Sequence, residues 1–320
     1  MDASTGTPLR PILTLTVNPA LDVSTSTAAV VGEHKMRCGP TRLDPGGGGV
    51  NVSRVIQNLG GQTLAIYTIG GPTGEAYRRL VEAEGMPTLV VPITGSTREN
   101  FTVDETGTGN QFRFVLQGPH LSEPEWKACL ARVAESIRTG GYVVASGSLP
   151  PGVPHDFYAR VARLARDREA RCIVDASGPA LAEALAEGVF LVKPSGRELD
   201  ELVGSTLDTE ESQISAASSL VDRGSAEFVA LTLAGAGAIL ASATGVSRLQ
   251  VPKVTVQSTV GAGDSFLGAF VLRIAQGHDA ATAFRAAVAA GSATAMTPAT
   301  ELCHRADVER LEAELALSAA

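Results

Sequence analysis

The stretch Ser258-Thr259-Val260-Gly261-Ala262-Gly263-Asp264-Ser265-Phe266 lies between a β-rich run, LQVPKVTV (249–256), and an apolar helical run over 266–275. Its two glycines can adopt backbone angles that other residues avoid. The start of the following helix presents unpaired N–H groups at the positive end of the helix dipole. The stretch therefore predicts a turn between a strand and a helix that can hold an oxyanion.

Outward from this turn, short β-rich runs alternate with helical patterns along the chain. Repeating apolar residues predict a helix over 50–59 that stops at Gly60-Gly61, and the capping-box sequence SEPE starts another at Ser122 that runs to about residue 137. Strands separated by helices pair in parallel and form a layered α/β sheet. The clearest predicted strands are PILTLTV (11–17), TLAIYTI (63–69), YVVAS (142–146), RCIVDA (171–176), VFLVK (189–193) and FVALTL (228–233).

Two segments interrupt this alternation. Residues 22–44 and 98–116 contain β-like stretches without intervening helices, and the second reads as a hairpin around the turn TGTG. They predict a small sheet that stands off the main domain. The alternative is that they add edge strands to the main sheet. We expect residues 9–320 to form one domain and residues 1–8 to be a loose, flexible tail.

Composition excludes several classes of protein. The 26 basic residues against 34 acidic ones give a net charge of −8, which opposes nucleic-acid binding. The 19-residue uncharged run 228–246 contains three glycines, so it predicts two buried strands around a turn and not a membrane span. The four cysteines are far apart, and the first residues do not resemble a signal peptide, so we expect free thiols and a cytoplasmic protein.

Asp264 and a second glycine cluster are the strongest candidates for function. An Asp at a helix start is often only an N-cap, but beside an anion hole a carboxylate also suits the task of accepting a hydroxyl proton. Four glycines precede the helix over 50–59, in the sequence PGGGGVN (45–51), and we attribute them to close approach of a ligand. Asn51 offers a donor and an acceptor to such a ligand. No Gly-Lys pair occurs, so the chain has no P-loop, and Gly235-Ala236-Gly237 does not complete a dinucleotide motif.

These two glycine motifs, in this order and about 200 residues apart, resemble the PfkB family of ribokinase-like carbohydrate kinases. The resemblance extends from ILTLTVNPALD (12–22) to ATELCHRAD (299–307). Within the family the chain is most similar to 6-phosphofructokinases of type II, and then to 1-phosphofructokinases and tagatose-6-phosphate kinases. The supporting stretches are PGGGGVNVSR, TREN, NQFRFVLQG, SGSLPPGV, LVKPSGREL and STVGAGDSF.

The resemblance implies an α/β, ribokinase-like fold, with a central mostly parallel sheet flanked by helices and a small lid of β-strands. Such lids often pair with the lid of another subunit, so we expect a homodimer. Asp264 is implied as the catalytic base, with Gly261, Ala262 and Gly263 as its anion hole. The residues implied in sugar-phosphate binding are Asp22, Gly47, Gly48, Asn51, Ser148 and the cations Lys35, Arg37, Arg98 and Arg113, where Arg98 is the phosphate contact and Lys35, Arg37 and Arg113 assist from the lid.

The resemblance also implies a nucleotide site, with Glu198 as a metal contact. Its residues are Lys193, Ser195, Glu198, Thr232, Gly237, Ser258, Thr259 and Ser292. Two positions depart from the family pattern: Ser195 stands where relatives commonly have Asn, and Ala234 where close relatives have Gly. For Ser195 two interpretations stay open: a water-mediated contact with the nucleotide and its magnesium, or a helix cap with Glu198 as capping-box partner.

The implied function is transfer of a phosphoryl group from ATP with Mg²⁺ to a phosphoketohexose, first of all fructose 6-phosphate. The alternatives are a 1-phosphofructokinase, a tagatose-6-phosphate kinase and, from another class, a sugar-phosphate sensor without catalysis. The expected partners are ATP and the sugar phosphate, without nucleic acid or membrane. Whether the enzyme also needs a monovalent cation such as K⁺ is left open. Because the transition state of phosphoryl transfer is loose, we expect Asp264 to work even with a low pKa at its helix start.

Overall fold

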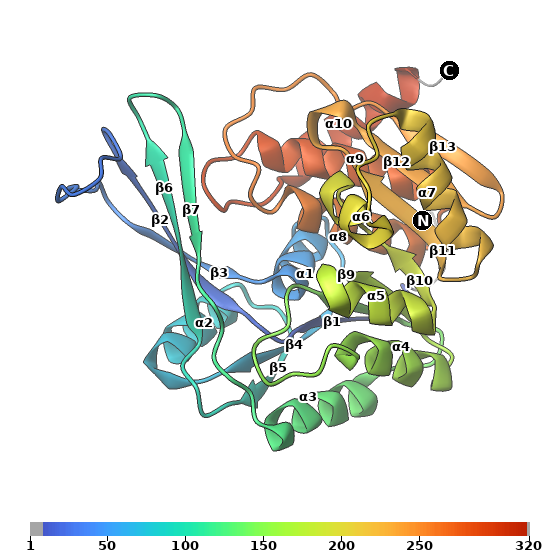
Figure 1. Ribbon diagram of the computed structural model, residues 1–320, viewed down its shortest axis with the longest axis horizontal. Coiled ribbons are helices and arrows are strands. Elements are labelled where there is room, and N and C mark those ends of the chain that lie inside the picture. The colour runs from blue at the N-terminus through green and yellow to red at the C-terminus, as the bar shows by residue number, and fades with distance from the viewer. Residues whose placement is uncertain (1–8, 319–320) are drawn as a thin grey trace, which may run out of the picture.

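A nine-stranded sheet forms the centre of the protein in the computed structural model, which describes residues 9–318 (Figure 1). Seven neighbouring strands of this sheet are parallel to one another: β5, β4, β1, β8, β9, β10 and β11. At the β11 edge, β12 and β13 are added in antiparallel orientation. This confirms the six strands and the mostly parallel sheet predicted from sequence. The order is β13 (Gly245–Leu249), β12 (Ala238–Ser242), β11 (Ala226–Thr232), β10 (Val189–Val192), β9 (Arg171–Asp175), β8 (Tyr142–Ser146), β1 (Ile12–Thr16), β4 (Leu64–Ile69) and β5 (Thr88–Pro92).

Helices cover both faces of this sheet, because the strands are apolar on both sides. One layer contains α3 (Glu123–Ser136), α4 (Phe157–Asp167), α5 (Gly178–Glu187), α6 (Gly196–Val203) and α7 (Glu210–Asp222). The other contains α1 (Gly48–Asn58), α2 (Gly71–Ala83), α8 (Ala262–Ala275), α9 (Ala280–Ala295) and α10 (Arg305–Ser318). Leu13 and Leu15 of β1 face the first layer while Ile12 faces the second, as expected for alternating side chains.

A second, four-stranded sheet stands beside the main body and is coloured blue to green in Figure 1. Its order is β3 (Arg42–Gly46), β2 (Ala20–Thr27), β6 (Arg98–Glu105) and β7 (Gln111–Val115), and we call these four strands the lid. Only β2 and β6 pair in parallel. The prediction of a separate small sheet is confirmed, and the alternative of edge strands on the main sheet is wrong.

The local predictions hold with two exceptions. Ser122 and Glu125 form the expected capping box of α3, and the uncharged run forms β11 and β12 around a short 3₁₀ helix, η1 (Ala234–Ala236). The run LQVPKVTV is not a strand beyond Leu249, because β13 ends there and residues 250–261 contain no helix or strand. The helix after it starts at Ala262, one turn earlier than predicted.

Three further predictions concern the chain as a whole. Within residues 9–318, no helix has the length and apolar character that crossing a membrane requires. All four cysteines are free; Cys38 is exposed, and the others are buried. The tail predicted for residues 1–8 lies outside the described residues.

Candidate active site

Asp264 lies in the first turn of α8, where the helix points its N-terminus toward the lid side of the molecule (Figure 1). Gly261 is the N-cap residue and has φ +77°, which favours glycine. A Cβ atom there would lie 2.7 Å from the Leu302 side chain. The Gly261–Gly263 turn therefore keeps its backbone N–H groups at a helix start, as an anion hole requires.

The Asp264 carboxylate sits among other charged groups. The pKa of Asp264 is raised to about 7, mainly by burial and also by the nearby carboxylates of Asp175 and Asp22. Asn51 and Lys193 act in the opposite direction and lower it. The low pKa that we expected from the helix start is therefore wrong, because loss of hydration outweighs the helix dipole. A carboxylate with a pKa near 7 is well matched to general-base work at neutral pH.

Asp175 was not singled out from the sequence, although it ends β9 at the edge where the carboxyl ends of the parallel strands meet. Its Oδ1 lies 3.1 Å from Nζ of the buried Lys193, which follows β10. Burial lowers the pKa of Lys193, but Asp175, Asp264 and Glu198 together more than reverse this, so the net shift is upward. The signal for Asp175 was its position, because ligands of open α/β sheets bind at the carboxyl ends of strands.

Lys193 also lies against the Gly261–Gly263 turn. A Cβ atom on Gly263 would come within 3.3 Å of its Nζ. The absence of a side chain at Gly263 lets the ammonium group approach the start of α8. The structure therefore brings Lys193, Gly263 and Asp264 together, as the resemblance implied.

The glycine cluster before α1 packs against protein atoms. A Cβ on Gly46 would meet the Asp22 carboxylate, one on Gly48 would meet Ser146 Oγ at 2.1 Å, and one on Gly49 would meet the backbone oxygen of Leu15 at 2.4 Å. Gly47 has φ +120° and lies against Thr16. Our interpretation that a ligand explains the four glycines needs correction, since the neighbouring strands already occupy these positions.

Two hydrogen bonds hold the implied sugar-binding groups. Asn51 Nδ2 donates to Asp264 Oδ2 at 2.8 Å, and Asn100 Nδ2 donates to Asp22 Oδ1 at 2.9 Å. Burial raises the pKa of Asp22, against the opposing effects of Asn100, Arg98 and Arg113. The charge of Asp22 on the lid also raises the pKa of Asp264 on α8, so the two carboxylates lie close enough to interact.

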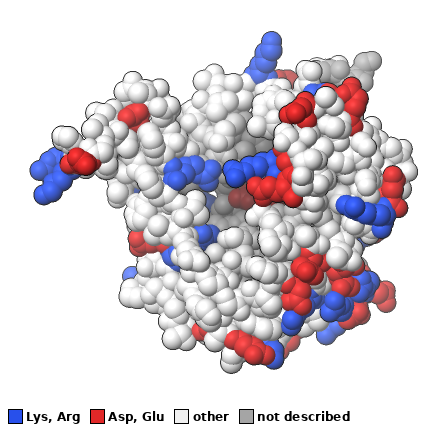
Figure 2. Space-filling model, viewed as in Figure 1, with Lys and Arg blue, Asp and Glu red and all other residues white. Residues whose placement is uncertain are grey.

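Two of the four basic residues that the resemblance implies in sugar-phosphate binding, Arg98 and Arg113, lie near Asp22. Arg98 is partly buried; its Nη1 donates to the Leu116 oxygen and its Nη2 to the Asn18 oxygen, while its Nε is buried without a partner. Arg113 on β7 is exposed and acts on Asp22 through its charge. Figure 2 shows a hollow between the lid and the main body with basic side chains at its edge.

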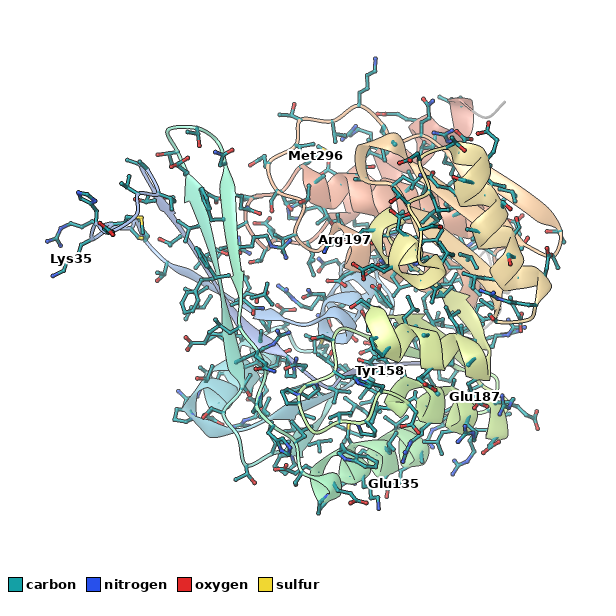
Figure 3. The ribbon with its side chains drawn as sticks, in the orientation of Figure 1. Lys35, Glu135, Tyr158, Glu187, Arg197 and Met296 are labelled. Carbon is teal, nitrogen blue, oxygen red and sulfur yellow. The ribbon has the colours of Figure 1, made fainter. Side chains whose placement is uncertain are left out.

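Lys35 and Arg37 do not join this group within one chain. Both are exposed in the connection between β2 and β3, and Figure 3 shows Lys35 at the far tip of the lid, pointing away from the main body. Ser148 is exposed, and its Oγ accepts a hydrogen bond from Nδ2 of Asn18 at 3.1 Å. Asn18, whose Oδ1 is buried without a partner, is a further polar group at this site that the sequence did not single out.

Ser195 and Glu198 form a complete capping box at the start of α6. Ser195 Oγ accepts from the Glu198 N–H at 3.3 Å, and Glu198 Oε2 accepts from the N–H and Oγ of Ser195 at 2.8 and 2.9 Å. The prediction that Ser195 caps this helix, with Glu198 as its partner, is therefore confirmed. Within residues 9–318 Glu198 Oε1 receives no hydrogen bond, so this oxygen can still face a metal.

The loop after β11, which the resemblance implies in nucleotide binding, has two residues with backbone angles that favour glycine. Gly237 has φ +109°, and a Cβ there would lie 2.2 Å from the Leu249 oxygen. Ala234 has φ +48°, which explains why glycine suits that position: a non-glycine residue in this region costs about 1–2 kcal/mol. Thr232 forms an isolated bridge with Ser195, so the loop and the start of α6 are adjacent.

The other implied nucleotide residues lie around the turn before α8. The Ser258 hydroxyl donates to the Ala299 oxygen at 2.6 Å, and Thr259 is exposed. Ser292 is buried in α9, and its hydroxyl donates to the Val288 oxygen within the same helix. Ser292 can therefore donate to the nucleotide only if this bond opens, although its oxygen can still accept a hydrogen bond.

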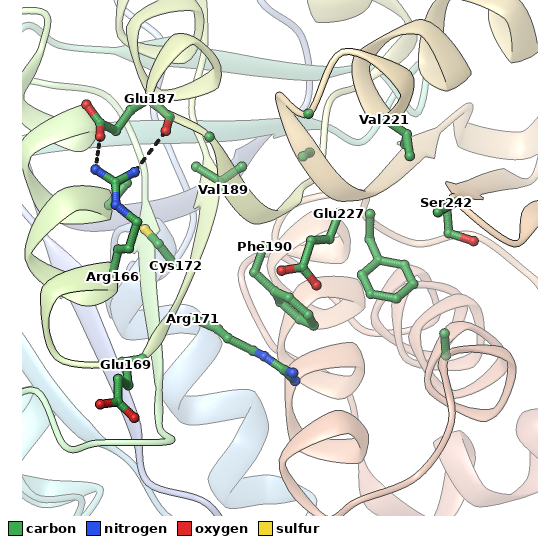
Figure 4. A pocket seen from close by; sticks show the side chains of 18 of the residues that line it. Arg166, Glu169, Arg171, Cys172, Glu187, Val189, Phe190, Val221, Glu227 and Ser242 are labelled. Atoms are coloured by element: carbon green, nitrogen blue, oxygen red, sulfur yellow. Dashed lines mark hydrogen bonds and ion pairs between the residues drawn. The ribbon is translucent and has the colours of Figure 1, made fainter.

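A cavity of about 870 Å³ lies elsewhere, at the amino ends of β9, β10 and β11 (Figure 4). Arg166 and Glu187 pair at its rim, and Arg171 lies over the Phe190 ring inside it. None of the implied site residues lines this cavity. We place the candidate active site at the opposite ends of these strands, where Asp264, Lys193 and Asp175 meet.

The acidic side chains of the described residues do not provide a complete set of metal ligands. Within residues 9–318, no group of three or more His, Cys, Asp or Glu side chains could hold a metal ion. Mg²⁺ commonly binds through one or two carboxylates together with substrate phosphates and water. Asp175 and Glu198 fit such a partial set of ligands, which the nucleotide would complete.

The α/β fold with its separate small sheet is that of the ribokinase-like sugar kinases. The family model described as pfkB family carbohydrate kinase matches residues 19–306, and the chain belongs to this family. Over 299 residues it is 46% identical to the ATP-dependent 6-phosphofructokinase isozyme 2 of Mycobacterium tuberculosis, covering 93% of this chain and 88% of that protein.

Two further relatives are informative. The Escherichia coli isozyme 2 is 40% identical over 95% of this chain and 98% of that protein, and its structure with fructose-6-phosphate has a TM-score of 0.91 at 39% identity, covering 96% and 99% of the two chains. Other structures of that enzyme contain potassium or show a tetrameric inhibited form. A 1-phosphofructokinase of Bacillus subtilis is 34% identical over 89% of this chain and 93% of that protein.

Proposed function

We propose that the protein is an ATP-dependent 6-phosphofructokinase that converts fructose 6-phosphate to fructose 1,6-bisphosphate. The observation that carries the proposal is the Asp264 carboxylate, whose pKa is near 7, at the N-terminus of α8 next to Asn51 and Lys193. The relatives with 40–46% identity support the choice of sugar, because both are 6-phosphofructokinases and cover nearly the whole chain. The 1-phosphofructokinase is more distant.

In this proposal Asp264 accepts the proton of the attacking sugar hydroxyl. Asn51 fixes the orientation of the carboxylate, and Asp22 orients a second hydroxyl from the lid. The N–H groups of the Gly261–Gly263 turn and the Lys193 ammonium stabilise negative charge on the transferring phosphoryl group. Closure of the lid excludes water, which would otherwise accept the phosphoryl group.

Arg98 and Arg113 supply the positive charge for the phosphate that the sugar already bears. The planar guanidinium fits phosphate oxygens in pairs, and the unpartnered Nε of Arg98 is a donor available to such a group. We propose that Lys35 and Arg37 contribute from the lid of a second subunit, since both are exposed and Lys35 points away from its own site (Figure 3). This makes a homodimer the functional unit.

Mg²⁺ bound with ATP would neutralise charge on the nucleotide phosphates. Glu198 through Oε1 and Asp175 are the residues that would hold it or its waters, while Thr232, Gly237, Thr259 and Ser292 surround the nucleotide. A potassium requirement is part of the proposal because the E. coli enzyme has been seen with that ion. We also propose a cytoplasmic location, as expected for an enzyme of sugar-phosphate metabolism.

The test compares turnover of three sugar phosphates with ATP by coupled ADP release. We expect kcat/KM for fructose 6-phosphate to exceed those for fructose 1-phosphate and tagatose 6-phosphate by at least about tenfold, since one misplaced phosphate contact costs about 1.5–3 kcal/mol. A higher value for either of the other sugars would assign the chain to that activity. Binding without ADP release would support the sensor alternative.

A further inference from the structure

A chain of hydrogen bonds connects the lid to the turn before Asp264. It runs through Asp44, Thr300, the Ala299 carbonyl and Ser258, and we call it the Asp44–Ser258 bridge. Neither the sequence motifs nor the proposed roles above account for Asp44 and Thr300, although both side chains are almost completely buried. Buried polar side chains cost free energy unless they are well partnered, so such a network needs an explanation.

The bridge begins beside the sugar site. Asp44 on β3 lies directly opposite Asp22 on β2 in the antiparallel register, so the two side chains project from the same face of the lid. Three residues hold Asp44. Arg42 donates to both of its oxygens, at 2.7 and 3.1 Å, and Thr300 Oγ1 donates to Oδ2 at 2.5 Å. Arg54 forms a longer ion pair with Oδ1, at 3.9 Å. Any displacement of β3 therefore acts on residue 300.

The bridge continues through the segment that follows α9. Arg42 Nη1 also donates to Glu301 Oε2 at 2.9 Å, so the lid holds this segment at two adjacent residues. Between α9 and this contact, Ala299 has φ +54°, a conformation that a non-glycine residue keeps only where its surroundings enforce it. The segment is thus fixed by the lid at one end.

The last links reach the anion hole. The Ser258 hydroxyl donates to the Ala299 oxygen at 2.6 Å and accepts from the Val260 N–H at 3.3 Å. The Leu302 side chain fills the space beside Gly261. Movement of residues 299–302 consequently changes the support of the turn that leads to Asp264.

We propose that the Asp44–Ser258 bridge couples the binding of the two substrates. Binding of the sugar phosphate beneath the lid then positions the Ser258–Gly263 turn for ATP. Arg42, Asp44 and Thr300 are positioning residues in this scheme and touch neither substrate. Since coupling between two binding sites is reciprocal, ATP must favour sugar-phosphate binding by the same factor. The inference rests on the proposed function, because it takes fructose 6-phosphate as the ligand of the lid.

The test measures the dissociation constant of a non-hydrolysable ATP analogue with and without saturating fructose 6-phosphate by calorimetry on the full-length protein. We expect the sugar phosphate to tighten analogue binding at least about fivefold in the wild type, the lower end of typical coupling. Thr300→Val keeps the shape and removes the hydroxyl, so the factor should fall below about two. Thr300→Ser should restore most of the coupling, because it keeps the donor.

The matched control is Thr63→Val, which removes another buried threonine bond, to Ser53, at the opposite ends of the strands. It should lower stability without changing the coupling factor. If Thr300→Val does not fold, Arg42→Met decides, since Arg42 is half-exposed, orients Asp44 and binds Glu301 next to Thr300.

Two results would overturn the inference: no coupling in the wild type, or unchanged coupling in the folded Thr300→Val or Arg42→Met variant. An equal loss in Thr63→Val would also contradict it, because the effect would then follow stability alone. Turnover of fructose 6-phosphate by the wild type is measured first. Absence of turnover would reject the proposed function, whereas turnover with unchanged coupling in the variants rejects the bridge alone.

Discussion

Asn51 Nδ2 on α1 donates a 2.8 Å hydrogen bond to Asp264 Oδ2 on α8, although 213 residues separate the two in the chain. The bond fixes one carboxylate oxygen. Within residues 9–318 no donor occupies Oδ1 of Asp264. The second oxygen is therefore free to receive the proton of a substrate hydroxyl, which is what a general base must offer.

Asp264→Asn should lower kcat by at least about 10², as expected for loss of a positioned proton acceptor. The variant should fold, because Asn keeps the shape and avoids the unfavourable burial of a charge. ATP affinity should change little. The measurements are kcat with fructose 6-phosphate and a thermal melt; a kcat near that of the wild type would remove Asp264 from the catalytic role.

Activity should depend on pH through the same carboxylate. Because Asp264 must be ionised to accept a proton and its pKa is about 7, kcat/KM should rise with pH and level off above that value. The Asn51 bond lowers this pKa, so Asn51→Ala should shift the rise to higher pH. A profile already flat from pH 6 to 8 in the wild type would contradict the assignment.

The raised pKa also has a consequence for stability of the free protein. Its folded value of about 7 exceeds the ordinary 3.8, so protonated Asp264 favours folding, and this contribution is complete below pH 4 and lost as pH rises through 7. Asp264→Asn should therefore melt at the same or a higher temperature than the wild type at pH 8. The relative stability of the variant should decrease toward pH 5.

Arg98→Ala should raise KM for the sugar phosphate by about tenfold or more, the effect of losing a charge-assisted hydrogen bond of 1.5–3 kcal/mol, with KM for ATP little changed. Some stability should also be lost, since Arg98 binds the backbone oxygens of Leu116 and Asn18. Arg79→Ala, at an exposed arginine on α2, is the control and should leave both KM values unchanged. An unchanged sugar KM in Arg98→Ala would move the phosphate contact elsewhere.

Ser195→Ala should lower the free energy of unfolding by about 0.5–2 kcal/mol, because the capping box of α6 is lost. If Ser195 is a cap alone, the dependence of activity on Mg²⁺ and ATP should not change beyond what Glu198 loses in orientation. Ser195→Asn, which can also cap, is the matched control. A large rise in KM for ATP with normal stability would instead place Ser195 in the nucleotide site.

The lid should join two subunits. Phe114, Val115 and Leu116 at the end of β7 are all 45% or more exposed, and β7 is an edge strand of the small sheet. Val115→Asp should shift the protein toward monomer in sedimentation or scattering, whereas Val246→Asp on β13 should not. A wild-type monomer at assay concentration would exclude the lid dimer, and a tetramer would show that a second interface exists.

The sequence by itself determined the layered α/β fold, the six central strands and the glycine turn before a helix at residues 258–266, and it favoured a separate small sheet. These features follow from local rules: hydrophobic period, glycine backbone freedom and helix capping act over a few residues. The capping box at Ser122 and the hairpin over 98–116 are examples, since the capping bonds and the pairing of β6 with β7 join residues close in the chain.

Only the tertiary structure decided the properties that depend on packing. The helix start predicted a low pKa for Asp264, but burial raises it, and desolvation is a property of the folded environment. Glycines at 46, 48 and 49 are required because a Cβ atom there would collide with Asp22, Ser146 and Leu15. These residues lie on other strands, which only folding brings next to the glycines. The bond between Asp44 and Thr300 joins residues 256 apart, and no local pattern encodes such a pair because only the folded chain brings them within reach.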